Sequence, residues 1–145
     1  RRRALERLAR ELGVRERVDF AGVQSQEQIA ALLRRAAVLL APSVVARDGN
    51  RESGLIVVKE ASASGAVPIG SLHGGIPESI ESGRTGFLVA ERDAAGMGQC
   101  LSNLLENSAL RAQMSHEGRR KMEREFDNRR LVASLEEIYD EVSHS

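Results

Sequence analysis

The sequence contains few of the residues that cross-link chains, stack on bases or span membranes. Among its 145 residues there are one cysteine (Cys100), no tryptophan and 3% aromatic residues. A single cysteine excludes an internal disulfide and fits a reducing compartment, so a cytoplasmic location is expected. The scarcity of aromatic residues argues against a stacking platform for single-stranded nucleic acid. No apolar run approaches the ~20 residues that a membrane-spanning helix needs.

The sequence also lacks net charge, because Lys+Arg and Asp+Glu both total 21. A protein built to coat nucleic acid would carry a basic excess, so no nucleic-acid partner is expected. Two local basic groups, at 1–3 and 119–121, have two interpretations: solvated helix faces, or a peripheral contact with an anionic membrane. No His, Cys and Asp residues cluster at the spacing of metal ligands, so no metal site is expected.

Short apolar runs alternate with amphipathic helical patterns along the chain. This alternation predicts an α/β fold: a Rossmann-like parallel sheet with helices on both faces, followed by a helical C-terminal tail. Ser25 and Gln28 have the spacing of a capping box, and Asp93 can cap the first helix of the tail. The continuously apolar run 38–41 is typical of a strand buried on both faces. The expected strands are 18–21, 38–41, 66–69 and 87–89, and the expected helices are 1–12, one following Ser25, 54–64, a short one near 77–81 and three beyond Asp93.

The stretch 47–78 contains the residues with the clearest chemistry. Two carboxylates, Glu52 and Glu60, flank an apolar helical segment, and a glycine-rich turn follows at 73–75. Free N–H groups of the first helical turn, at 53–55, and the positive end of the helix dipole favour an anion. The carboxylates can accept hydrogen bonds from hydroxyls, and the glycines let further backbone amides approach. A sugar nucleotide offers both partners, because it carries a diphosphate and many hydroxyls.

These residues also have a purely structural interpretation. Carboxylates near a helix start are often surface residues that complement the dipole, which would account for Glu52. Glu60 lies in an apolar segment and needs a partner, and Lys59 or Ser64 could be that partner. His73 is expected to be a loop histidine without a catalytic role.

Three sequence motifs, taken in order, resemble one enzyme family. They are E-S-G-L-I-V-V-K-E at 52–60, G-G-I-P-E at 74–78 and G-R-T-G-F-L-V at 83–89. The set resembles the retaining glycosyltransferases of family 4, which have the B-type glycosyltransferase fold, and most closely the bacterial members that assemble exopolysaccharide and capsule. Glu52 and Glu60 match the E-x7-E motif of that family. V-D-F-A-G at 18–22 and A-P-S at 41–43 extend the likeness to nearly the whole chain.

The resemblance implies a role for each matching position. Glu60 would bond the ribose hydroxyls of a nucleotide-sugar donor, such as a UDP- or GDP-sugar, and Glu52 would act at the donor sugar and transition state. The sugar would pass with retention to a polysaccharide or lipid-linked glycan acceptor, with no cofactor and no required metal. The other donor-binding positions are Ser53, Gly54, Leu55 and Ile56 at sugar and phosphate, Gly22 and Val23 near the base, and Gly74 and Gly75.

The same resemblance implies that parts of the family's usual architecture are absent from 1–145. Its donor-binding domain opens with two further strands, and an acceptor-binding domain precedes them. The chain is therefore expected to be a partial domain, truncated at its N-terminus and inactive alone. The absent strands would lie between 18–21 and 38–41, so 38–41 is expected at an open edge. Such an edge invites self-association, unless the strand 18–21 moves beside it.

Two other function classes fit the pattern less well. A non-catalytic Rossmann-like interaction module, such as a receiver domain, needs acidic residues where strands end, but the strands here end at Gly22, Pro42 and Gly70. A sugar-nucleotide epimerase of similar fold is the other alternative.

Overall fold

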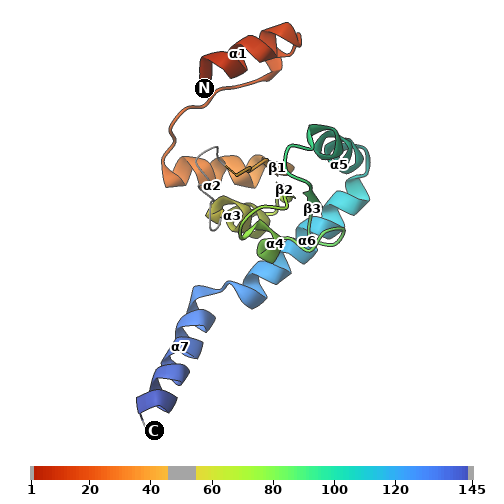
Figure 1. Cartoon of the computed structure of the whole chain (residues 1–145). Coiled ribbons are helices and arrows are strands. Elements are labelled where there is room, and N and C mark those ends of the chain that lie inside the picture. Colours follow the sequence, from red (N-terminus) through yellow and green to blue (C-terminus); the bar gives the residue numbers. More distant parts are fainter. Residues whose placement is uncertain (1, 46–54, 144–145) are drawn as a thin grey trace.

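A three-stranded parallel sheet forms the centre of the computed structural model, which describes residues 2–45 and 55–143 (Figure 1). The strands are β1 (Val38–Ala41), β2 (Val67–Ser71) and β3 (Phe87–Val89), in the order β1-β2-β3. Val38 pairs with Val67 at one end of the first ladder, and Ser71 pairs with Val89 at the end of the second. Because β2 is paired on both sides and helices pack on both faces of the sheet, all five of its residues are buried.

Helices cover both faces of this sheet. On one face α2 (Gln26–Arg35), α3 (Ile56–Ser64) and the short α4 (Ile76–Ser79) pack around Leu33, Val58 and Ile76. On the other face α5 (Ala94–Glu106) and α6 (Ser108–Glu125) pack around Leu104 and Met114. The predicted fold class, an α/β parallel sheet with helices on both faces and a helical C-terminal end, is confirmed.

Local hydrogen bonds fix where several helices begin and end. The predicted capping box of α2 is present: Gln28 N–H donates to Ser25 Oγ (3.3 Å), and Ser25 N–H donates to Gln28 Oε1 (2.8 Å). Asp93 caps α5 as predicted, with its Oδ1 accepting from Gly96 N–H at 2.8 Å. Gly65 ends α3 in the left-handed conformation (φ 93°), which a residue with a Cβ adopts only under strain.

The predicted strand at 18–21 is wrong. The helix α1 (Arg2–Glu11) and a 3-10 turn, η1 (Arg15–Arg17), precede an irregular segment that joins no sheet. That segment bonds locally instead: the Val18 carbonyl accepts from the Arg15 guanidinium at 3.0 Å, and the guanidinium groups of Arg2 and Arg15 lie over the Phe20 ring. A strand needs a neighbour for its N–H and C=O groups, and no described strand lies beside 18–21; α1 lies apart from the sheet in Figure 1.

The expected open edge at 38–41 is confirmed, but the expected burial of both its faces is wrong. Within the described residues β1 pairs only with β2. Leu40 keeps 43% of its surface exposed and borders a largely apolar hollow of about 270 Å³ below α5. The alternative in which 18–21 moves beside this edge does not occur, and self-association remains a prediction.

The last helix, α7 (Asn128–Ser143), extends away from the sheet on the side opposite to α1 (Figure 1). It has none of its described residues buried, although Leu131, Leu135 and Ile138 follow a helical spacing. In the ranges 2–45 and 55–143, no helix is long and apolar enough to cross a bilayer.

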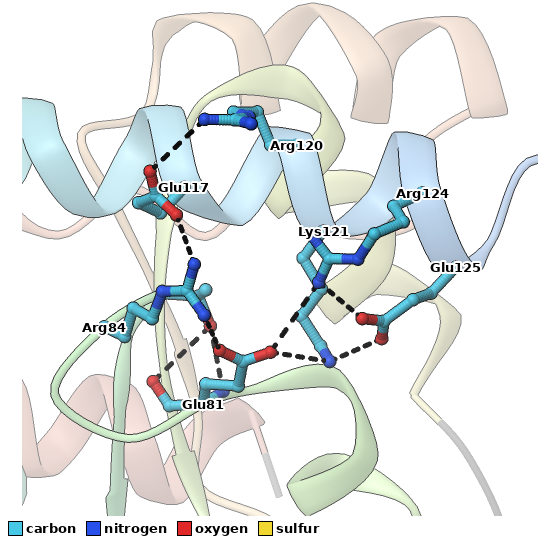
Figure 2. Close-up of polar contacts among 8 residues, drawn as sticks. Glu81, Arg84, Glu117, Arg120, Lys121, Arg124 and Glu125 are labelled. Carbon is cyan, nitrogen blue, oxygen red and sulfur yellow. Dashed lines mark hydrogen bonds and ion pairs between the residues drawn. The ribbon is translucent and has the colours of Figure 1, made fainter.

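A group of charged side chains, the ionic cluster, fastens the turn between α4 and β3 to α6 (Figure 2). Its centre is Lys121, whose side chain is 9% exposed and whose ammonium donates to Glu81 (3.1 Å) and Glu125 (2.5 Å). Arg84 bridges Glu81 (3.0 Å) and Glu117 (2.9 Å). The members are Glu81, Arg84, Glu117, Arg120, Lys121, Arg124 and Glu125.

The packing around Gly86 leads to a first prediction. A Cβ built there would collide with the backbone oxygen of Pro68 and lie 3.2 Å from Ile80. Because a carbonyl in the central strand cannot move aside, Gly86→Ala is expected to lower the free energy of unfolding by about 2–3 kcal/mol. Gly98→Ala is the matched control, because a Cβ at this position of helix α5 meets nothing within 4 Å. Alanine favours a helix more than glycine does, so the free energy of unfolding should rise by about 0.5–1 kcal/mol. Urea denaturation of both variants measures this, and a Gly86→Ala variant as stable as wild type would contradict the packing.

A second prediction concerns Lys121. Burial lowers the pKa of this ammonium, but its hydrogen bonds to Glu125 and Glu81 outweigh burial and the pKa is raised overall. Lys121→Met keeps an apolar stem and removes the charge. The free energy of unfolding is therefore expected to fall by about 1–2 kcal/mol. Arg119→Met, which breaks the exposed pair with Glu123, should cost less than about 0.5 kcal/mol.

The effect of Lys121→Met should also depend on pH. The hydrogen bond from Lys121 is the largest cause that lowers the pKa of both Glu81 and Glu125 from the ordinary value of 4.5. A carboxyl with a lowered folded-state pKa stabilises the fold above 4.5, and this contribution disappears as pH falls through the lowered value. The stability difference between wild type and Lys121→Met should therefore shrink below pH 4.5, and a constant difference down to pH 2 would contradict the pairing.

Candidate functional site

The carboxyl ends of the three strands meet at one edge of the sheet, because all three are parallel. The chain leaves β1 through Pro42, leaves β2 through Leu72 and leaves β3 through Ala90. Ligands of open α/β sheets bind outside this edge. The buried Ser71 hydroxyl ties two of the strand ends together by donating to the Ser43 carbonyl at 2.5 Å.

A carboxylate links all three strand ends at this edge. Glu91 follows β3; its Oε1 lies 2.8 Å from His73 Nδ1, after β2, and its Oε2 accepts from Val45 N–H at 3.1 Å, after β1. These bonds, from His73 first and Val45 second, lower the pKa of Glu91. An ionised carboxylate can only accept, so Nδ1 of His73 carries the proton and donates it.

The glycine-rich turn after β2 begins at this His73. The His73 side chain is buried, and its carbonyl accepts from Ile76 N–H at 3.1 Å, so ring and backbone are both held. Gly74 has a φ of 50°, which favours glycine, and it is exposed to solvent, whereas Gly75 is half-buried. The helix that follows, α4, has only four residues, so the turn can offer individual backbone amides but little helix dipole.

The start of α3 lies beside this turn. Leu55, the residue before the helix, packs on an apolar cluster that contains Ala41 from β1 and Ile76 from the start of α4. The neighbouring Ile56 is 71% exposed. Of the positions that the sequence assigned to one site, Leu55 thus packs against the same cluster as Ile76, the residue that follows Gly74 and Gly75.

Glu60 lies one turn further along α3, on the side that faces α2. It is half-buried and borders a depression of about 220 Å³, which is also lined by Gln26 and Ser64. Lys59, the structural partner considered for Glu60, points elsewhere: its ammonium lies 3.9 Å from the centre of the Phe126 ring.

The remaining predicted positions lie before α2 or outside the described residues. Gly22 (φ 71°) and the fully exposed Val23 lie in the segment between η1 and α2, and neither lines the Glu60 depression. Glu52, Ser53 and Gly54 lie outside the described residues. In 2–45 and 55–143, no three His, Cys, Asp or Glu residues lie close enough to hold a metal ion.

The sequence interpretation missed Glu91 and the burial of His73. A signal was present, because each residue lies two positions after the end of a strand, where polar side chains gather at the binding edge. Their pairing was not visible, since 18 positions separate them and only the sheet register brings them into contact.

Comparison with known proteins identifies the family. The family model "Glycosyl transferases group 1" matches residues 1–121. The chain is 32% identical over 142 residues to WcaL of Escherichia coli, whose name assigns it to colanic acid biosynthesis as a glycosyltransferase, and this match covers 94% of the chain. It is 33% identical over 126 residues, 87% of the chain, to the amylovoran biosynthesis glycosyltransferase AmsK of Erwinia amylovora. The chain spans about a third of the length of these relatives, 35% and 31% respectively.

Solved structures share the fold. Sucrose-phosphate synthase from Thermosynechococcus elongatus superposes with a TM-score of 0.84 at 26% identity, over 99% of this chain and 34% of that one. HepE of Anabaena, solved in complex with UDP, has a TM-score of 0.82 at 22% identity, over 99% of this chain and 36% of that one. From the match over 1–121, the chain belongs to the group 1 glycosyl transferases.

Proposed function

We propose that this chain binds the nucleotide-sugar donor of a glycosyltransferase that builds a bacterial surface polysaccharide. The observation that carries the proposal is that the start of α3 and the segment after the Gly74–Gly75 turn meet in one apolar cluster, which contains Ile76 and against which Leu55 packs. Support also comes from the relatives named for polysaccharide biosynthesis and from the UDP complex of HepE.

In this proposal the donor diphosphate lies over the first turn of α3. Backbone N–H groups there are directed away from the helix, and the helix dipole of nine residues adds a partial positive charge. The exposed amide of Gly74 would approach from the other side, and Ser53 and Gly54 would complete the set.

Glu60 would accept hydrogen bonds from the ribose hydroxyls. Its carboxylate borders a depression that α2 closes on the far side, and Gln26 of α2 contributes a second polar group there. Gly22 and Val23 would lie near the base, just before α2 begins. The half-buried position of Glu60 would strengthen these bonds, because a carboxylate acceptor is stronger where solvent is partly excluded.

Glu52 would act at the transferring sugar. In the same proposal, a hexosyl group is transferred from a UDP- or GDP-sugar with retention of its anomeric configuration, as in family 4, and no metal is required. The acceptor is a glycan or a lipid-linked glycan bound by an N-terminal domain, and the enzyme works in the cytoplasm or at the inner face of the membrane.

The competing function is nucleotide binding without transfer, in an interaction module or an epimerase. Incubation of the full-length protein with a panel of UDP- and GDP-sugars separates these functions. Release of free UDP or GDP that depends on a glycan acceptor supports a transferase, whereas conversion of the sugar nucleotide into its epimer supports the alternative.

Replacement of Glu60 tests the ribose contact. Glu60→Gln in the full-length protein removes a charged acceptor, and losing a charge-assisted hydrogen bond costs ~1.5–3 kcal/mol. UDP should therefore bind roughly 10- to 150-fold more weakly by calorimetry. Glu123→Gln, at an exposed position of α6, should bind UDP as wild type does. An unchanged affinity in a folded Glu60→Gln variant would remove Glu60 from the site.

Replacement of Glu52 tests the catalytic assignment. A group that acts on the transferring sugar contributes more in the transition state than in the ground state. Glu52→Ala in the full-length protein is therefore expected to lower kcat by at least about 100-fold while changing UDP affinity little. Steady-state transfer kinetics measure both quantities, and wild-type turnover in the variant would exclude this role.

A further inference from the structure

We propose that Glu91 is a positioning residue for the nucleotide, a role that rests on the proposed function. Through His73 it fixes the Gly74–Gly75 turn relative to the end of β1. Glu91 bonds to His73 and Val45, and neither of these is a predicted donor contact. Its effect would pass through the turn that follows His73.

The geometry shows that both oxygens of one carboxylate are used. Oε1 accepts a hydrogen bond from His73 Nδ1 at 2.8 Å, and Oε2 accepts one from Val45 N–H at 3.1 Å. The Glu91 side chain thus connects the segment after β3 with the segments after β2 and β1. A backbone amide and a buried ring nitrogen set the distance that the side chain must span. The bridge therefore depends on the length of Glu91 as well as on its capacity to accept hydrogen bonds.

The backbone around Glu91 holds the carboxylate in this place. Arg92, the next residue, has a φ of 65°, a left-handed conformation that is uncommon for a residue other than glycine. A tight turn surrounds it, in which Asp93 N–H donates to the Ala90 carbonyl at 3.2 Å. The chain reverses here from β3 into α5, and Glu91 extends back over the other two strand ends.

His73 transmits the position of Glu91 to the glycines. Glu91 fixes one side of its buried ring. The His73 carbonyl accepts a hydrogen bond from Ile76 N–H, so His73 holds both the start and the end of the Gly74–Gly75 turn. Without Glu91, the Nδ1 proton would lie in a buried place without its acceptor, and the ring would turn or move outward. Either movement displaces the Gly74 amide from the diphosphate.

The test compares two conservative variants that separate length from charge. Glu91→Gln keeps the length: its oxygen can accept from Val45 N–H, and its NH2 can donate to His73 Nδ1 once the ring carries its proton on Nε2 instead. Glu91→Asp keeps the charge and is one methylene too short for the bridge. Glu123→Asp, on the exposed face of α6, serves as the matched control. Each full-length variant is measured for UDP affinity by calorimetry and for amide hydrogen exchange at 45 and 74–76 without nucleotide.

If Glu91 has this positioning role, the Glu91→Asp variant should bind UDP about tenfold more weakly than wild type. Its Gly74–Gly75 turn would no longer be pre-organised and would have to be ordered on binding. Its amides at 45 and 74–76 should exchange faster than in wild type, whereas Glu91→Gln and Glu123→Asp should match wild type in both measurements. A double variant, Glu91→Asp with His73→Ala, should bind UDP no more weakly than His73→Ala alone, because both act through one contact.

Two outcomes would overturn the inference. In the first, Glu91→Gln weakens UDP binding and Glu91→Asp does not, which would make charge the relevant property. In the second, Glu91→Asp has wild-type affinity and wild-type exchange. If wild-type protein binds none of UDP, GDP, a UDP-sugar and a GDP-sugar, the proposed function fails, and the exchange rates of the two Glu91 variants then decide the positioning role independently.

Discussion

Parallel pairing of β2 with both neighbours is the constraint on which the rest of this structure depends. It places three strand ends at one edge and delivers the segments after them to the same region. Because every residue of β2 is buried, the strand tolerates no polar side chain except near its end, where Ser71 and then His73 appear. The candidate site is therefore a consequence of strand direction before it is a consequence of any particular side chain.

The short helix α4 is held at both of its ends by contacts from other helices. α3 and α4 share one apolar cluster, which fixes the start of α3 next to the glycine turn. From α6, Lys121 holds Glu81, which lies just beyond the far end of the same short α4. The α4 segment is thus fastened at its start by Ile76 and at its end by Lys121, which suits a region whose backbone amides would meet a ligand.

Contacts between residues close in the sequence could be predicted from it, whereas contacts between distant residues could be predicted only in part. The Ser25–Gln28 box and the Asp93 cap depend on residues three positions apart, and the structure contains both. The run 18–21 has the composition of a strand, yet a strand exists only beside a partner, and none is described there. The Glu91–His73 pair depends on register across two strands, which no single stretch reveals. The predicted Glu52, Ser53 and Gly54 lie outside the described residues, so their roles stay predictions.

The isolation of α7 has a consequence for how the molecule unfolds. Its 16 residues have no buried position, so tertiary packing contributes little to its helicity. Isolated helices shorter than about 12–15 residues are marginal in water even when they are rich in alanine, and α7 is only slightly longer. Such a segment is expected to melt gradually and separately from the sheet. A heating curve followed by circular dichroism would then show a sloping loss of helix signal before the sharp transition of the α/β body.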